Sequence, residues 1–182
     1  MAGIFSGGGS LGSDVMIRAA LPSELADVGE LRVAAYRTDG FLAVGTGYES
    51  TLRNLGRSGD SEILVALRGG QLIGTVTLQR WSADGELLRG PDEAEIRALA
   101  VAPADRGQGT GRALVAAVID RAAASGVRHL VLCSLAGMHA AHRVYEQAGF
   151  SRLPERDFWP EPDLQLVAYG LILDGSRRPA SG

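Results

Sequence analysis

The sequence predicts a single α/β domain in which helices cover the faces of a mixed β-sheet. Apolar residues make up 46% of the 182-residue chain, which is enough for a sizeable core. Short apolar runs alternate along the chain with segments whose apolar residues recur at helical spacing. A strand, a helix and another strand follow one another between residues 95 and 135, which predicts a right-handed crossover between two parallel strands.

The first half of the chain predicts a strand, two helices and a hairpin. The strand covers residues 16–20, and a helix begins near Pro22 with apolar residues at helical spacing. A second, short helix is predicted from residue 48 to 55. Within residues 62–81, two apolar strands flank the turn Arg68-Gly69-Gly70-Gln71, which is typical of a hairpin.

The second half alternates strands and helices. A polar loop over residues 82–92 leads into it. Pro103, Gly126 and Gly149 are expected to end the elements that precede them. The predicted elements are a strand at residues 95–101, a helix at 109–125, a strand at 129–135, a helix at 140–148 and a strand at 164–173. The near-continuous apolar run of the 129–135 strand indicates burial on both faces.

Glycine and serine are frequent at both ends of the chain. We expect residues 1–15 to be a flexible leader or an engineered scar, and residues 175–182 to be a disordered tail. Residues 16–174 are then expected to form the one folded domain.

The composition excludes several functions. The 18 basic residues are all arginine, and with 21 acidic residues they give a net charge of −3, which argues against a nucleic-acid-binding surface. The longest purely apolar stretch, residues 113–119, is too short to cross a membrane, and no secretory signal is present. The sole cysteine, Cys133, excludes an internal disulfide and a cysteine-based metal cluster. These features predict a soluble, cytoplasmic protein that binds no nucleic acid, membrane or metal.

The glycine-rich segment Arg106-Gly107-Gln108-Gly109-Thr110-Gly111 lies between the 95–101 strand and the clearest helix. Glycines allow successive backbone N–H groups to turn toward one point, and a helix N-terminus adds further unpaired N–H groups, so this segment favours a phosphate. Arg106 and Arg112 add positive charge. A Walker-type loop requires lysine, and the dinucleotide fingerprint requires glycine at position 112, so both nucleotide-binding alternatives fail.

Three segments together resemble the GNAT N-acetyltransferases. The glycine-rich segment is similar to the family's acyl-CoA loop, R/Q-x-x-G-x-G/A, and residues 95–103 are similar to its central strand. Val144-Tyr145-Glu146-Gln147-Ala148-Gly149-Phe150 is similar to its Y-E-x-x-G-F segment. The order of elements resembles the family from about residue 17 to 173, and the specific motifs lie within residues 95–150. This resemblance implies the GNAT acyl-CoA N-acyltransferase fold, a mixed sheet of about six or seven strands flanked by about four helices.

The resemblance also implies acetyl-CoA as the co-substrate. In the family, the central strand separates from the next parallel strand, and the pantetheine arm enters the gap and binds strand backbone. The residues that match the family's acetyl-CoA contacts are Leu99, Ala100, Val101, Arg106, Gly107, Gln108, Gly109, Thr110, Gly111, Arg112, Arg143 and Tyr145. No metal is implied.

By resemblance, the chemistry is transfer of an acetyl group to a primary amine by direct attack in a ternary complex. Glu95 is the expected base, with Asp92, Glu93 or water as alternatives. The backbone N–H of Val101 is expected to stabilise the developing oxyanion, and Tyr145 to protonate the departing thiolate. The alternative function is a non-catalytic acyl-CoA-binding sensor on the same fold.

The acceptor is not identified by the motifs, and one motif position departs from the family. Met138 replaces an asparagine that contacts the pantetheine arm in many relatives. The acidic loop over residues 86–95 would suit a positively charged amine, and a homodimer through the C-terminal strands is possible, as in many relatives. The residues expected to line the acceptor pocket are Tyr36, Phe41, Tyr48, Trp81, Phe158 and Trp159.

Overall fold

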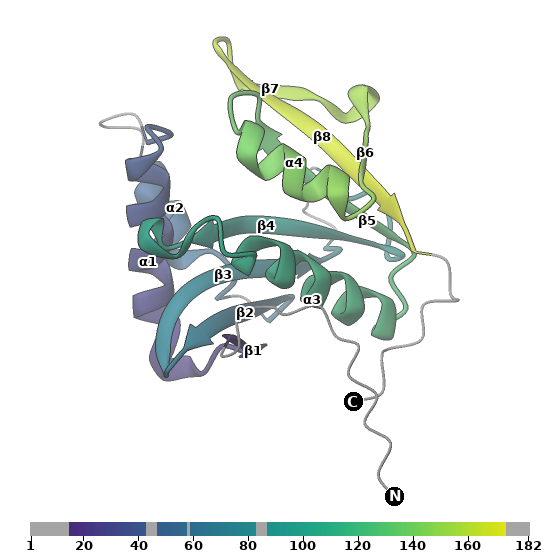
Figure 1. Cartoon of the computed structure of the whole chain (residues 1–182). Coiled ribbons are helices and arrows are strands. Elements are labelled where there is room, and N and C mark those ends of the chain that lie inside the picture. The colour runs from purple at the N-terminus through teal and green to yellow at the C-terminus, as the bar shows by residue number, and fades with distance from the viewer. Residues whose placement is uncertain (1–14, 43–46, 58, 83–86, 174–182) are drawn as a thin grey trace, which may run out of the picture.

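The structure is a computed structural model that describes residues 15–42, 47–57, 59–82 and 87–173. Within these ranges an eight-stranded mixed sheet is covered by four α-helices (Figure 1). The strands are β1 (Val15–Ala19), β2 (Ser61–Arg68), β3 (Gln71–Arg80), β4 (Glu93–Val101), β5 (His129–Leu135), β6 (Ser151–Arg152), β7 (Phe158–Glu161) and β8 (Leu164–Ile172). The helices are α1 (Leu25–Thr38), α2 (Tyr48–Asn54), α3 (Thr110–Ala124) and α4 (His139–Gln147).

The sheet confirms the predicted fold class. Its order is β1-β2-β3-β4-β5-β8-β6, with β7 paired to β8. Only β4 and β5 are parallel among these pairs, as expected for the strand–helix–strand unit that α3 completes. Eight strands replace the expected six or seven because β6 and β7 lack a strand signal in the sequence. β6 has two residues, and β7 contains Pro160.

Helices cover both faces of the sheet because the strands alternate apolar side chains toward each face. On β2, Ile63, Val65 and Leu67 form a small core with Val28 of α1. The next residues along β2, Leu64 and Ala66, belong to the main core with α3. Figure 1 shows α1 and α2 on one side of the sheet and α3 and α4 on the other.

The two central strands separate partway along their length. β4 pairs with β5 only from Glu93 to Ile96, opposite His129 to Leu132. Beyond this point β4 contains a bulge, where its register against β3 shifts and Ala98 takes a positive φ of 49°. β5 stays paired with β8 as far as Leu135. The β5–β8 pair therefore diverges from β4 toward the end of the sheet where α1 and α4 lie (Figure 1). This opening positions the candidate site.

The predicted ends of the chain fall largely outside the described residues. Of the expected leader, residues 1–14 lie outside them, and Val15 belongs to β1. The expected tail, residues 175–182, lies outside them as well. Among the described helices, none is long and apolar enough to cross a membrane.

Candidate active site

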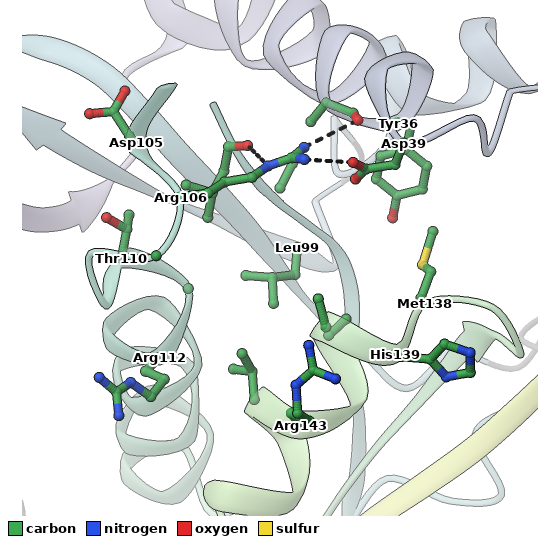
Figure 2. A pocket seen from close by; sticks show the side chains of 18 of the residues that line it. Tyr36, Asp39, Leu99, Asp105, Arg106, Thr110, Arg112, Met138, His139 and Arg143 are labelled. Carbon is green, nitrogen blue, oxygen red and sulfur yellow. Dashed lines mark hydrogen bonds and ion pairs between the residues drawn. The ribbon is translucent and has the colours of Figure 1, made fainter. Parts of the chain in front are cut away.

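A cavity of about 640 Å³ lies at the end of β4 that has separated from β5 (Figure 2). The end of β4, the glycine-rich loop, the first turn of α3, the start of α4 and the end of α1 line it. Ten of the twelve residues expected to bind acetyl-CoA line this cavity, and Gln108 and Tyr145 do not. The ten are Leu99, Ala100, Val101, Arg106, Gly107, Gly109, Thr110, Gly111, Arg112 and Arg143.

The glycine-rich loop has the backbone shape that a phosphate site requires. Gly107 and Gly109 have φ values of 73° and 86°, in a region where a side chain would be strained. Gly109 caps α3, so the unpaired N–H groups of the first helical turn lie at the cavity. Thr110 is 3% exposed, and its buried Oγ1 has no hydrogen-bond partner among the described residues. These groups fit an anionic oxygen acceptor such as the pyrophosphate of CoA.

Arg106 contacts protein groups, whereas the other two arginines of the cavity are not paired with acids. The Arg106 guanidinium lies 2.5 Å from the Asp39 carboxylate and also donates to the Ala35 and Val101 carbonyl oxygens (Figure 2). It therefore ties the loop to α1, and Asp39 compensates its charge. Arg112 and Arg143 have no carboxylate within 4.0 Å among the described residues. Figure 2 shows Arg143 directed from α4 toward Leu99.

A second cavity, of about 560 Å³, lies beside the preceding residues of β4. Glu95 and Arg97 from β4 line it, whereas Leu99 to Val101 line the first cavity. The two cavities therefore follow one another along a single strand. The other lining residues of the second cavity are Gln79, Ser82, Leu87, Leu88, Arg89, Glu155, Arg156, Asp157 and Phe158.

Two glutamates on β4 have opposite protonation behaviour. Burial raises the pKa of Glu95 to about 7, and the Arg97 guanidinium, 3.6 Å away, only partly opposes this. Burial would also raise the pKa of Glu93, but hydrogen bonds from Arg156, the Arg89 N–H and His129 lower it to about 2. Glu95 can therefore accept a proton near neutral pH, whereas Glu93 is held as a permanently charged partner of Arg156.

Tyr145 lies in the core, and the two residues before it on α4, Arg143 and Val144, line the first cavity. It is 6% exposed, and its ring packs against Phe150 and Tyr169, with centroids 6.0 and 6.3 Å away. Burial raises the pKa of its hydroxyl, so the group stays protonated. Burial also raises the pKa of Tyr36, and the nearby Tyr48 and Tyr145 raise it further. Tyr36 itself lines the first cavity.

The backbone of β4 offers a donor in the opening. The N–H of Ala102 donates to the Ile73 carbonyl of β3 at 2.8 Å. Because successive N–H groups of an extended chain point to opposite sides, the N–H of Val101 points away from β3 and toward the opening.

The aromatic residues expected around the acceptor are divided among three places. Tyr36 and Phe41 line the first cavity, together with Met138, and Phe158 lines the second. The other three line neither of these cavities and are partly exposed: Tyr48 (41%), Trp81 (39%) and Trp159 (57%). Of the acidic loop, residues 83–86 lie outside the described residues, and the charge of Glu93 is compensated by Arg156.

Three functional candidates escaped the sequence analysis. Asp39 is the partner of Arg106 across 67 positions of sequence, a distance over which no local pattern could link them. Arg156, which neutralises Glu93, ends the short 3-10 helix Pro154–Arg156 and carries no motif of its own. Arg97 carries a usable signal, because it stands two positions after Glu95 on a strand and must share its face.

Comparison with known proteins agrees with this geometry. Residues 29–150 match the Acetyltransferase (GNAT) family. The chain belongs to this family. Mycothiol acetyltransferase of Streptomyces coelicolor is 35% identical over 134 residues, which cover 74% of this chain and 40% of that protein. N-acetylaspartate synthetase of Danio rerio is 32% identical over 100 residues, or 55% of this chain and 33% of that protein. The matched part is thus less than half of either relative.

Solved GNAT structures share the fold across nearly their whole length. The ribosomal-protein-S18-alanine N-acetyltransferase from Escherichia coli has a TM-score of 0.67 at 22% identity, covering 90% of this chain and 98% of that one. The yncA protein from Salmonella typhimurium, solved with acetyl-CoA, has a TM-score of 0.66 at 23% identity, covering 93% and 100%. At these identities the likeness establishes the GNAT fold. Among the described residues, no group of three or more His, Cys, Asp or Glu side chains is arranged to hold a metal ion.

The raised pKa of Glu95 predicts a pH-dependent stability. Between its ordinary pKa of 4.5 and the folded value of about 7, the folded protein retains a proton that the unfolded chain has lost. Stability contributed by this proton is therefore lost as the pH rises through that window. The free energy of unfolding of Glu95→Gln, taken relative to that of the wild type, should therefore increase by about 3 kcal/mol from about pH 4 to pH 8. Urea unfolding at both pH values measures this, and identical pH dependence in the two proteins would contradict it.

Proposed function

We propose that this protein transfers an acetyl group from acetyl-CoA to a primary amine by direct attack, with both substrates bound at once. The observation that carries the proposal is the order of groups along β4. The strand contributes Leu99 to Val101 to a cavity that suits CoA, and contributes Glu95, with a pKa of about 7, to the cavity beside it. Amine acetylation requires a group that accepts a proton near neutral pH, placed beside the site that holds the acetyl donor.

Acetyl-CoA would bind in the first cavity. Its pantetheine arm would pair with the free edge of β4 at residues 99–101 as an added strand does, and its pyrophosphate would bind the N–H groups of the loop and the start of α3. Arg112 and Arg143 would supply the charges, because Asp39 already compensates Arg106. The acetyl-CoA present in the related yncA structure supports this assignment.

The reaction would proceed as follows. An amine at Glu95 loses a proton to this carboxylate, directly or through water, and its nitrogen attacks the thioester carbon. The Val101 N–H stabilises the negative charge that develops on the thioester oxygen. As the C–S bond breaks and the amide forms, the nitrogen releases its second proton to water, and Tyr145 donates a proton to the thiolate and is later reprotonated from solvent. Burial favours the neutral, proton-donating form of Tyr145.

The same observation favours an enzyme over a non-catalytic sensor of acyl-CoA. A sensor requires the first cavity alone. It gains nothing from a buried carboxylate whose pKa is held near 7 in the second cavity, and burying such a group costs stability.

Replacing the unpaired arginines should weaken acetyl-CoA binding. We expect Arg112→Gln and Arg143→Gln each to raise the dissociation constant about tenfold, because each loses a charged contact with phosphate. Isothermal titration calorimetry measures this. The matched control is Arg121→Gln, which lies on α3 away from the cavity and pairs with Glu62. Equal weakening by the control, or none by the other two, would contradict the assigned phosphate site.

Glu95→Gln should alter the pH dependence of turnover. For the wild type, we expect kcat/KM for a primary amine to rise with pH through about 7 as Glu95 becomes able to accept a proton. The variant should be at least about tenfold slower and should lack this step. The pH–rate profiles of the two proteins provide the test, and superimposable profiles would exclude Glu95 as the base.

Tyr145→Phe should lower turnover while leaving the donor bound. The hydroxyl acts only when the thiolate departs, so we expect kcat to fall at least about tenfold and the dissociation constant of acetyl-CoA to change little. Steady-state kinetics and calorimetry on the same preparation separate these effects. Phe150→Leu alters the packing around the same ring and is the control for structural damage. Unchanged kcat in Tyr145→Phe would remove this residue from the mechanism.

A further inference from the structure

Two arginines, Arg32 and Arg97, lie near one another on the face of the sheet that carries the second cavity. Arg32 of α1 is only 1% exposed, and its guanidinium donates to the Leu52 carbonyl (3.2 Å), the Leu55 carbonyl (2.8 Å) and the Thr77 Oγ1 (2.6 Å). All three acceptors are neutral, and among the described residues this buried positive charge has no acidic partner within 4.0 Å.

Arg97 lies next to this buried charge. Its register partner across the β3–β4 pair is Thr77, the residue that Arg32 contacts. Residues opposite one another in an antiparallel pair project from the same face, so both guanidinium groups occupy one region. Arg97 donates to the neutral Gln79 Oε1 at 2.9 Å, and its Nε lies 3.6 Å from the Glu95 Oε1. Within 4.0 Å of either arginine, Glu95 is the sole carboxylate among the described residues.

In the part of the chain that the structure describes, the charge around these arginines is unbalanced. The buried lining residues Arg156 and Asp157 are already paired, with Glu93 and Arg152 respectively. Arg89 and Glu155, both exposed at the rim, have opposite signs and cancel. Among the described residues, Arg97 therefore lines the second cavity with Glu95 as its nearest carboxylate, and the buried Arg32 adds a further positive charge close to it. That carboxylate becomes neutral when it takes a proton from the acceptor. An anionic group supplied by the acceptor would restore the balance where screening by water is weak.

We infer that the acceptor is a small amine with a carboxylate one carbon away, as in a free α-amino acid, whose amine meets Glu95 and whose carboxylate pairs with Arg97. This inference rests on the proposed acetyl transfer and names its substrate class. Glu95 and Arg97 extend from alternate positions of β4 and converge to 3.6 Å, which matches an ammonium and a carboxylate joined through one carbon. The planar guanidinium fits a carboxylate with two parallel hydrogen bonds. A cavity of about 560 Å³ is of a size that holds a small molecule.

The first test compares acids with their amides on the wild-type protein. Acetyl-CoA and each of the common L-amino acids are assayed for CoA release, together with the matching amino-acid carboxamides, the decarboxylated amines and spermidine. The carboxamide keeps the amine and side chain and removes only the negative charge. We expect kcat/KM for the best amino acid to exceed that for its carboxamide at least about tenfold, through KM.

The second test uses Arg97→Gln, with Arg97→Lys as the variant that keeps the charge. Arg97→Gln should raise KM for the amino acid about tenfold and leave KM for the carboxamide unchanged, and Arg97→Lys should restore part of the preference. Acetyl-CoA binding by both variants verifies folding. Arg80→Gln, on the exposed end of β3 outside the cavity lining, should behave as wild type.

The outcomes separate this inference from the proposed function. Efficient acetylation of carboxamides, simple amines or spermidine, equal to or better than that of amino acids, overturns the inference and leaves acetyl transfer intact. If Arg97→Gln still prefers the amino acid to its carboxamide, the proposed role of Arg97 is overturned. The absence of turnover with every amine, despite acetyl-CoA binding, overturns the proposed function and this inference with it.

Discussion

The early end of the pairing between β4 and β5 is the constraint on which the site depends. After Ile96 and Leu132 the two strands share no ladder, and the bulge at Ala98 turns β4 away. Backbone N–H and C=O groups in the opening therefore lack the partners that a continuous sheet would provide, and such groups need partners when they are buried. The pantetheine arm of acetyl-CoA is a chain of amides that can supply them. The same divergence makes room for the first cavity, and the pairing that remains holds Glu95 rigidly beside it.

Side chains of the same type differ in whether a neighbouring residue compensates their charge, and this difference separates structural residues from candidates for the chemistry. Glu93 and Glu95 lie two residues apart on β4, yet one is fixed as an ion by Arg156 and the other is left to exchange protons. The arginines divide in the same way. Arg106 is tied to Asp39 and anchors the loop to α1, whereas Arg112 and Arg143 lie at the cavity without an acidic partner among the described residues. In both sets, the group with a satisfied partner supports the architecture, and we propose that the others act on or bind a substrate.

The sequence predicted the elements that depend on local signals and missed those that depend on distant partners. The apolar run of β5 marked both of its ends correctly, and the glycines of the loop identified the start of α3 within one residue. The bulge could not be predicted, because Ala98 has no special preference for a positive φ and adopts it only in the finished sheet. The partners Asp39 and Arg156 lie far along the chain from the groups they neutralise. The motif led to the proposal of Tyr145, but its packing against Phe150 and Tyr169 follows from the tertiary structure.

A crystal structure of the protein with acetyl-CoA tests the central claim most directly. We expect the pantetheine arm to lie between residues 99–101 of β4 and residues 133–135 of β5, with the pyrophosphate on the glycine-rich loop. The thioester oxygen should lie within hydrogen-bond distance of the Val101 N–H, and the acetyl carbon should face Glu95. A complex in which the donor binds elsewhere, with the opening between β4 and β5 left free, would contradict the account.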